Sequence, residues 1–519
     1  MSLPSGARDG LSSVTRGTLF LLIGTLCFVG LTFLARVIII RNISTGEWSA
    51  FSFALALVAV VVAVGSVGLP TAVARSLPYA STDAERRTIV RGALVVGGAA
   101  AVVSGLVLWL LGPWITSTLH FADLGPALTV FPIAAGTSVA VSLIAAIFQG
   151  YEDVTPNALF IQVITPLLFV GFLAAAYVLP PTGIDYESAL LAYVLANVAA
   201  LLLTIGYALR RLPHLLSPGE GSPGALGHLM RFSAPLLLVT LMATLIGSGD
   251  TLVLGVYHPT EVGTYSVSLT LARLLQVGVG AAAYIFLPVA ARLLRRQDTA
   301  AIGVTYVTVT KWLILFSLPL FLLFVFLPSR SLDFVYGTAY AGIIVLPLEI
   351  TVVGAFLTTA LGPAANAQVA FGQTRLLAYN SVVAAAVDLG LAFALVPSEG
   401  FIGAATAWAA ANVVYTALSL IEFGLITGLH PFRPHFLVPL VVTAVPVAAF
   451  LAFVPVHYPL WSLPVLGIGI AGLFVLVVLL TRSIDEGDRL LLGAIEGMFG
   501  RPLPFLRRIG RMGLPRPKP

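Results

Sequence analysis

Residues 17–41 read GTLFLLIGTLCFVGLTFLARVIIIR. Arg41 ends this apolar run, and Arg36 is the one charged residue inside it. A helix needs about 20 apolar residues to cross the hydrocarbon core of a bilayer. This run is longer than the apolar core of a cleavable signal peptide, and no small-residue cleavage site follows it. We therefore predict an uncleaved first transmembrane helix.

The composition extends this prediction to the whole chain. Of 519 residues, 59% are apolar and 9% are charged, whereas soluble domains average about 25% charged residues. This excludes a soluble globular protein and predicts an all-α polytopic membrane protein. Cys27 is the only cysteine, so the sequence excludes an intrachain disulfide and a thiolate metal cluster.

Apolar runs separated by Gly, Pro or charged residues predict fourteen transmembrane helices. The predicted spans are 17–41, 48–69, 92–112, 126–149, 157–179, 188–209, 231–256, 263–290, 302–327, 341–362, 378–396, 403–425, 436–454 and 461–481.

The positions of the basic residues predict the orientation. If the N-terminus is cytoplasmic, inner segments hold 22 of the 27 Lys and Arg residues, and outer segments hold only Arg41 and Arg330. Because cytoplasmic loops carry the excess of basic residues, we expect both termini in the cytoplasm. We expect a multi-pass protein of the plasma membrane.

The first six spans are echoed by spans seven to twelve. Residues 46–48 (GEW) are followed by 68–70 (GLP), and residues 263–265 (GTY) by 286–288 (FLP); later, 192–198 matches 407–413. An even number of spans gives both copies the same sense across the membrane, as in transporters with parallel repeats. We therefore predict two parallel six-helix lobes around a central cavity, with two further C-terminal helices.

This division gives six segments. They are a cytoplasmic N-terminus (1–16), the N-lobe (17–211), a cytoplasmic linker (212–230), the C-lobe (231–428), spans 13 and 14 (429–481) and a cytoplasmic tail (482–519).

The segment 250–255 (DTLVLG), followed by 261–265 (EVGTY) and 271–273 (LAR), resembles the polysaccharide and oligosaccharide flippases. Their superfamily also contains the lipid II flippases and the multidrug and toxin extrusion transporters. The segment from 35 to 75 is similar to the opening of the same family. The resemblance implies alternating access by two lobes that move a lipid-linked oligosaccharide from the inner to the outer leaflet, for cell-envelope polysaccharide or glycoprotein assembly. It also implies that spans one, two, seven and eight line the central cavity.

Ionisable residues inside spans are costly and are functional candidates by default. Arg36 and Asp250 lie at similar depths on spans one and seven, and Arg273 lies near the middle of span eight. The phosphate or pyrophosphate of a lipid-linked sugar suits a guanidinium, which grips such groups bidentately. We predict substrate binding by Arg36 and Arg273, with Asp250 restraining an arginine or binding a coupling proton or cation. Snorkelling to the headgroups is the alternative for Arg36.

Three further charges, Lys311, Glu349 and Asp388, lie on spans nine to eleven. We interpret them as structural ion pairs, with proton relay as the alternative. Asn197 and Asn412 occupy equivalent places in the repeat, and we expect helix-to-helix hydrogen bonds there.

Several aromatic and terminal features bear on the membrane. Trp48, Tyr257 and Tyr265 are predicted to be anchors at the outer interface. The apolar stretch 490–499, followed by four arginines, predicts either a surface-bound amphipathic helix or a frayed basic tail.

Other function classes fit less well. The sequence has no phosphate-binding loop, no two-histidine zinc helix and no nucleotide-binding domain, so we expect no enzyme, no cofactor, no metal site and no nucleic-acid partner; a coupling H⁺ or Na⁺ is possible. A cation-coupled exporter of small amphipathic molecules is the closest alternative, and a membrane sugar polymerase or ligase is a more distant one. We expect a monomer that contacts membrane lipids, its lipid-linked substrate and other polysaccharide-assembly proteins.

Overall fold

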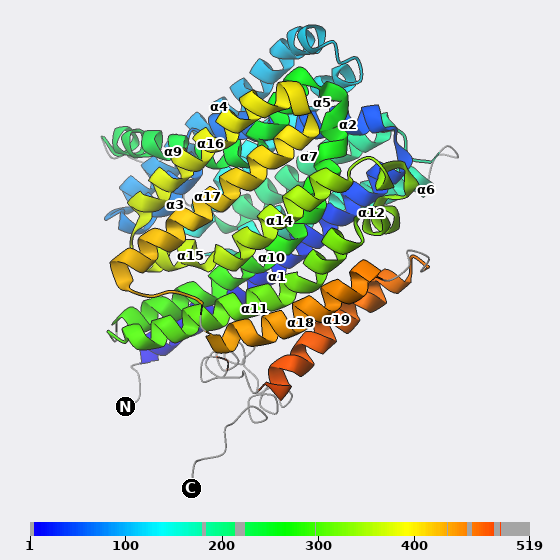
Figure 1. The fold of residues 1–519 in the computed structure, drawn as a ribbon. Coiled ribbons are helices and arrows are strands. Elements are labelled where there is room, and N and C mark those ends of the chain that lie inside the picture. Colours follow the sequence, from blue (N-terminus) through cyan, green and yellow to red (C-terminus); the bar gives the residue numbers. More distant parts are fainter. Residues whose placement is uncertain are drawn as a thin grey trace. The chain divides into compact units, whose positions relative to one another are not determined.

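The computed structural model describes residues 5–178, 183–212, 224–295, 297–432, 434–453, 459–481 and Asp488. Within these ranges the regular structure is helical, with no strand (Figure 1). The chain is a multi-pass membrane protein, as its sequence predicts. The predicted tail helix at 490–499 lies outside the described residues.

The chain forms two compact units. The N-unit contains Ile23–Ser266 and Asp388–Ala407. The C-unit contains Met1–Leu22, Val267–Val387 and Trp408–Pro519. The predicted division into two six-helix lobes and a two-helix appendage stays a prediction.

The N-unit is built mainly from eight of the described helices, which come from the first half of the chain. Its helices are α1 (Ser5–Asn42, from Ile23 onward), α2 (Thr45–Gly65), α3 (Leu69–Ser76), α4 (Asp83–Leu119), α5 (Leu124–Gly150), α6 (Thr165–Val178), α7 (Tyr186–Arg211) and α9 (Ala225–Tyr257). Short 3₁₀ turns at Leu77–Tyr79 and Pro259–Glu261 and a π-helix at Asn157–Ile164 complete it. Helix α5 packs against α2, α4 and α7, and so forms the centre of the unit.

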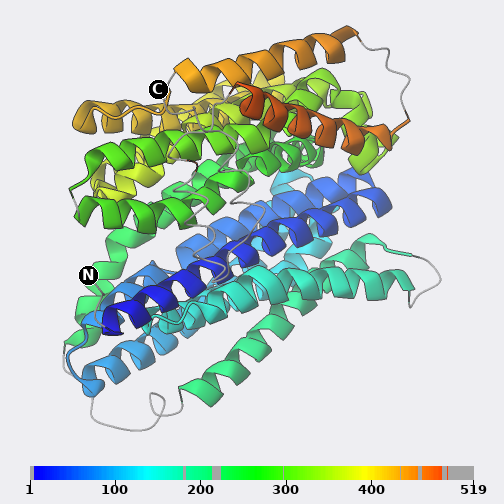
Figure 2. The ribbon, with the colours of Figure 1, turned by 90° about the horizontal axis from the view of Figure 1, so that it is seen from below.

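The C-unit contains most of the remaining helices. They are α10 (Val262–Arg295), α11 (Thr299–Phe326), α12 (Pro328–Tyr336), α13 (Thr338–Ala341), α14 (Val345–Leu361), α15 (Pro363–Ala370), α16 (Thr374–Glu399), α17 (Phe401–Thr427), α18 (Pro434–Phe453) and α19 (Ser462–Leu480). Helices α10, α16 and α17 also contribute residues to the N-unit. Helix α11 packs against α14, α18 and α19, and the last two helices form a neighbouring pair (Figure 2).

Twelve helices of the described chain are long and apolar enough to cross a membrane, where the sequence predicts fourteen spans. The twelve correspond to the predicted spans other than 263–290 and 436–454. The first of these two coincides with the 34-residue helix α10, and the second with the shorter apolar helix Val438–Phe453.

Two of the helix starts have clear sequence causes. Ser44 precedes α2 and accepts a hydrogen bond from the Glu47 backbone N–H, while the Glu47 side chain accepts one from the Ser44 backbone N–H. Asp185 and Ser188 form the same reciprocal arrangement at α7. Such capping boxes satisfy backbone donors that a helix N-terminus otherwise leaves without partners.

The predicted span 157–179 contains an irregularity that hydropathy does not reveal. Its first part is a π-helix from Asn157 to Ile164, and Thr165 Oγ1 donates to the carbonyl oxygen of Phe160, five residues earlier, at 2.7 Å. Short π-helical segments within helices often occur at functional sites. Ile161 of this π-helix lines a cavity in the N-unit.

Candidate functional site

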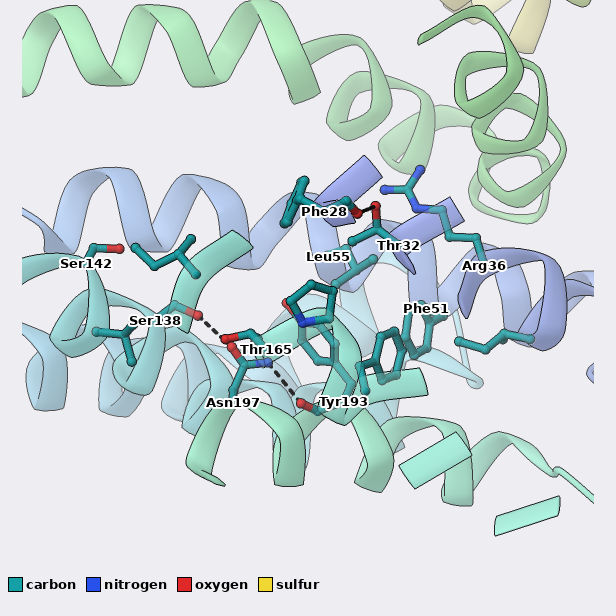
Figure 3. Close-up of a pocket in the computed structure, with 15 residues that line it drawn as sticks. Phe28, Thr32, Arg36, Phe51, Leu55, Ser138, Ser142, Thr165, Tyr193 and Asn197 are labelled. Atoms are coloured by element: carbon teal, nitrogen blue, oxygen red, sulfur yellow. Dashed lines mark hydrogen bonds between the residues drawn. The ribbon is translucent and has the colours of Figure 1, made fainter. Parts of the chain in front are cut away.

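A cavity of about 340 Å³ lies inside the N-unit (Figure 3). The five bordering α-helices contribute residues three or four positions apart, a spacing that places them on one helix face. The lining residues are Phe28, Thr32, Arg36 and Ile39 of α1; Phe51 and Leu55 of α2; Ser138, Val141 and Ser142 of α5; Ile161 of the π-helix; Thr165, Pro166 and Phe169 of α6; and Tyr193 and Asn197 of α7.

One side of the cavity is organised by hydrogen bonds. Ser138 Oγ donates to Asn197 Oδ1 at 3.1 Å, and Asn197 Nδ2 donates to the Tyr193 carbonyl oxygen at 2.9 Å. The first bond joins α5 to α7, so the predicted helix-to-helix bond of Asn197 is confirmed. The structure gives Asn412 a bond to Trp408 of its own helix, at 2.9 Å.

The cavity combines one cation with aromatic rings and small polar groups. Tyr193 packs edge-on against Phe51 and Phe169, with ring centroids 6.1 and 5.3 Å apart. The half-buried Arg36 and the amide of Asn197 occupy opposite sides of the view (Figure 3). Ligand pockets typically have volumes of about 300–1,000 Å³, so this cavity has room for one small group.

A second polar site in the N-unit brings two carboxyl groups together. Asp250 of α9 and Asp388 of α16 have no exposed surface. The Tyr265 hydroxyl donates to Asp250 Oδ2. A Cβ atom at Gly249 would lie 3.3 Å from Asp388 Oδ2, so the Asp388 carboxylate lies against the residue that precedes Asp250. Within the described part of the chain, neither Asp388 oxygen has a hydrogen-bond partner.

The burial of two aromatic side chains corrects their predicted position at the membrane interface. Tyr265 and Trp48, predicted to be outer-interface anchors, are 0% and 1% exposed. Trp48 Nε1 donates to the carbonyl oxygen of Gly263 at 3.2 Å. The prediction was wrong for both residues, because position along a span indicates depth and not the face on which a side chain lies. Tyr257, the third of the set, is exposed.

The remaining candidates lie in the C-unit. Arg273 of α10 and Glu349 of α14 are half-buried. Lys311 of α11 forms an ion pair with Asp488, with Nζ and Oδ2 2.5 Å apart. Asp488 belongs to the tail, so this partner lies outside the predicted spans. Among the described residues, no group of three or more His, Cys, Asp or Glu side chains is placed to hold a metal ion.

The fold is that of transporters in the MOP superfamily. A structure of the lipid II flippase MurJ in its inward closed conformation matches with a TM-score of 0.65 and 13% identity, over 88% of this chain and 98% of that one. An inward-facing multidrug resistance MATE family transporter matches with a TM-score of 0.60 and 16% identity, over 78% and 98%. A Vibrio cholerae MATE transporter matches with a TM-score of 0.52 and 15% identity, over 80% of this chain and 97% of that one.

The family follows from the sequence. The model of the family described as "Polysaccharide biosynthesis protein" matches residues 14–294, more than half of the chain. The chain therefore belongs to the polysaccharide biosynthesis protein family, as the resemblance in its motifs implies. No curated protein matches it significantly.

Proposed function

We propose that the protein is a flippase that moves a lipid-linked oligosaccharide from the inner to the outer leaflet by alternating access. Membership of the polysaccharide biosynthesis family and a fold shared with a lipid II flippase support this proposal. It includes action as a monomer in the plasma membrane with both termini in the cytoplasm. The products are cell-envelope polysaccharide or glycoprotein, made together with other assembly proteins.

The observation that carries the proposal is the position of Arg36 on the wall of the cavity. A guanidinium binds phosphate oxygens bidentately and stays charged at all working pH values. The aromatic rings and hydroxyl groups around the cavity suit the apolar faces and hydroxyls of a sugar. The volume of about 340 Å³ fits a phosphate with the first sugar better than a whole oligosaccharide.

Arg273 is proposed as a second cationic contact. It is half-buried on α10, ten residues into the predicted span 263–290. A charge near the middle of a span is costly unless it faces protein, an anion or water. In an alternating-access cycle, a second arginine gives the phosphate a cationic partner at another stage.

The experiment uses a bacterial strain that lacks its own flippase for a defined polysaccharide. Arg36→Ala is expected to reduce delivery of the lipid-linked sugar to the outer face at least about tenfold, because a charge-assisted contact contributes about 1.5–3 kcal/mol. Arg36→Lys keeps the charge and loses the bidentate fork, so we expect partial activity. Arg41→Ala, an exposed arginine of the same helix, is the matched control and should retain activity. Full activity of Arg36→Ala at normal expression would refute the headgroup contact, and the same series applies to Arg273.

Asp250 and Asp388 are proposed as the coupling site. Two buried carboxyl groups in one unit repel each other when both are ionised, and a proton or a monovalent cation relieves that repulsion. This observation also favours the second candidate function, a cation-coupled exporter of small amphipathic molecules.

Asp388→Asn separates the two functions when sugar delivery and efflux of a cationic dye are measured in the same cells. If the protein is a flippase, sugar delivery by Asp388→Asn no longer depends on the proton or sodium gradient. Neither this variant nor the unaltered protein then exports the dye. Gradient-dependent dye efflux by the unaltered protein, lost in Asp388→Asn, would instead support the exporter. Asp83→Asn, which changes an exposed carboxylate, controls for the loss of one negative charge.

A further inference from the structure

A polar cluster in the C-unit joins three helices around one carboxyl group. Glu422 of α17 is half-buried, and its Oε2 accepts hydrogen bonds from Gln368 Nε2 of α15 at 2.9 Å and Asn380 Nδ2 of α16 at 2.8 Å. Gln368 and Asn380 are 0% and 2% exposed. Asn380 Nδ2 also lies 3.4 Å from the hydroxyl oxygen of Ser419, one turn before Glu422. The carboxyl group is therefore held by donors from two other helices.

These hydrogen bonds leave the negative charge of Glu422 in place. Amide N–H groups are donors without a positive charge. Within the described part of the chain, no Lys, Arg or His side chain forms an ion pair with Glu422. Removing a charge from water is costly unless an opposite charge accompanies it. The half-buried carboxylate therefore favours a cation at this place.

The Gln368 side chain adds an oxygen that lacks a partner. Its Nε2 donates to Glu422, whereas its Oε1 is buried and has no hydrogen-bond partner among the described residues. Exchanging the two amide atoms would place oxygen against the oxygen of the ionised Glu422, so the donor faces the carboxylate. Because the two amide atoms share one carbon, the unpartnered oxygen lies next to the carboxylate.

The turn after α15 carries a second oxygen of this kind. Gln373 Oε1 is buried without a hydrogen-bond partner in the described ranges, and the Gln373 backbone N–H donates to the Gln368 carbonyl oxygen at 2.9 Å. Gln368 lies in the last turn of α15, and the C-terminal end of a helix carries a partial negative charge. Acceptor oxygens and negative charge thus gather at the end of this helix.

We propose that Glu422 and Gln368 form a binding site for a monovalent alkali cation. Hard cations take oxygen ligands from carboxylates and carbonyl groups, and helix ends supply such ligands in membrane transporters. One carboxylate balances one positive charge, so a divalent ion would leave an uncompensated charge in a half-buried site. Glu422 lies five residues before Thr427, the last residue of α17, so a cation reaches it near the end of the helix.

The site is separate from those of the proposed function. Its residues belong to the C-unit, whereas the Arg36 cavity and the Asp250–Asp388 pair belong to the N-unit. Sodium and potassium ions share the chemistry that the oxygens recognise. The proposal holds whether or not the protein is a flippase, because binding is measured without transport.

The main experiment measures thermal unfolding of the full-length protein in a nonionic detergent at constant pH. Sodium chloride and potassium chloride are the two probes, and choline chloride keeps the ionic strength constant. A cation that binds the folded state raises the melting temperature once its concentration exceeds the dissociation constant. Glu422→Gln removes the charge and keeps the size of the side chain, so the half-saturating cation concentration should rise at least about tenfold. Gln368→Leu removes the amide oxygen and should act in the same direction by a smaller factor.

Two control variants locate the response. Glu399→Gln removes an exposed carboxylate of α16 and should leave the cation response unchanged. Asp388→Asn alters the carboxyl pair of the N-unit, and the part of the response that Glu422→Gln abolishes should persist in it. A response to sodium, to potassium or to both identifies the cation. Equal responses of Glu422→Gln and the unaltered protein would overturn the proposal, as would equal stabilisation by choline chloride.

A second measurement uses the unaltered protein, so it remains decisive if Glu422→Gln does not fold. Hydrogen exchange of the peptide that spans α15 and the turn to Gln373 is followed while sodium or potassium chloride replaces choline chloride. Binding at Gln368 predicts a saturable decrease in exchange of that peptide, and helix α4 of the N-unit should show none. Unchanged exchange over the cation concentrations that stabilise the protein against heat, or an equal decrease in α4, would contradict the proposal.

Discussion

Replacement of Tyr265 by Phe tests the carboxyl site directly. The substitution removes one hydroxyl, which donates to Asp250 Oδ2, and leaves the ring in place. Because both side chains have no exposed surface, water does not replace the lost donor. A hydrogen bond to a charged group contributes about 1.5–3 kcal/mol, and one between neutral groups about 0.5–1.5 kcal/mol. The free energy of unfolding should therefore fall by the larger amount if Asp250 is ionised and by the smaller amount if it is protonated.

The assay is thermal unfolding of the purified protein, with Tyr257→Phe as the matched control. Tyr257 lies on α9 like Asp250 and is 46% exposed, so loss of its hydroxyl should change little. At about 2–4 °C per kcal/mol for units of 150–250 residues, an ionised Asp250 predicts a decrease of at least about 3 °C. In an Asp250→Asn background, Tyr265→Phe should have a much smaller effect, because the charged acceptor is gone. Equal melting temperatures for Tyr265→Phe and Tyr257→Phe would refute the assigned bond.

Three further predictions concern packing, hydrogen bonding and capping. A Cβ at Gly105 of α4 would lie 2.8 Å from the backbone carbonyl oxygen of Pro132 on α5, while nothing lies within 4 Å at Gly98 of α4; Gly105→Ala should therefore be less stable than Gly98→Ala by about 1–3 kcal/mol in thermal unfolding. Asn197→Ala should cost about 0.6 kcal/mol, the mean for bonds between membrane helices, and equal melting temperatures for this variant and the wild type would argue against the bond to Ser138. The Ser188 hydrogen bonds hold the pKa of Asp185 below its usual range; a lowered pKa means that this cap contributes stability above about pH 4 and loses it as the pH falls below that value. Asp185→Ala should cost about 1 kcal/mol at neutral pH and less in acid, where the carboxylate begins to be protonated, as measured by unfolding at pH 7 and pH 3.

Hydropathy was sufficient to place the long apolar helices, whereas the orientation drawn from charge stays a prediction. Each predicted span coincides with a helix because about 20 apolar residues without charge have few other stable conformations in a membrane. The same signal missed the break at Asn157–Ile164, since a π-helix differs from an α-helix in its hydrogen bonds and not in its composition. It also missed the short helices α12 and α15, which are too short to register as spans.

The sequence located the buried charges better than their partners. Asp250 and Asp388 are 138 residues apart along the chain, and no periodicity links them. Lys311 was assigned to pairing with other charges in the spans, but its partner Asp488 comes from the tail. Helical spacing relates residues within one turn or two, whereas these pairs depend on which helices pack together.

Arg36 lies on the wall of the cavity, which bears on where its side chain goes. An arginine near the end of a span has two physically reasonable positions, since its long side chain can reach the headgroups or turn toward protein. Its spacing from Phe28 and Thr32, four and eight residues earlier, places the three on one face of α1, and that face borders a cavity within the N-unit. The half-burial of Arg36 on that face is compatible with a guanidinium that meets an anion inside the unit. An anion that binds there neutralises the charge of Arg36 in the same unit that holds the two carboxyl groups of Asp250 and Asp388. Under the proposed function, an anion at Arg36 and a proton on the Asp250–Asp388 pair therefore act within one compact unit, and Asp388→Asn tests whether the loss of one carboxyl group changes anion binding at Arg36.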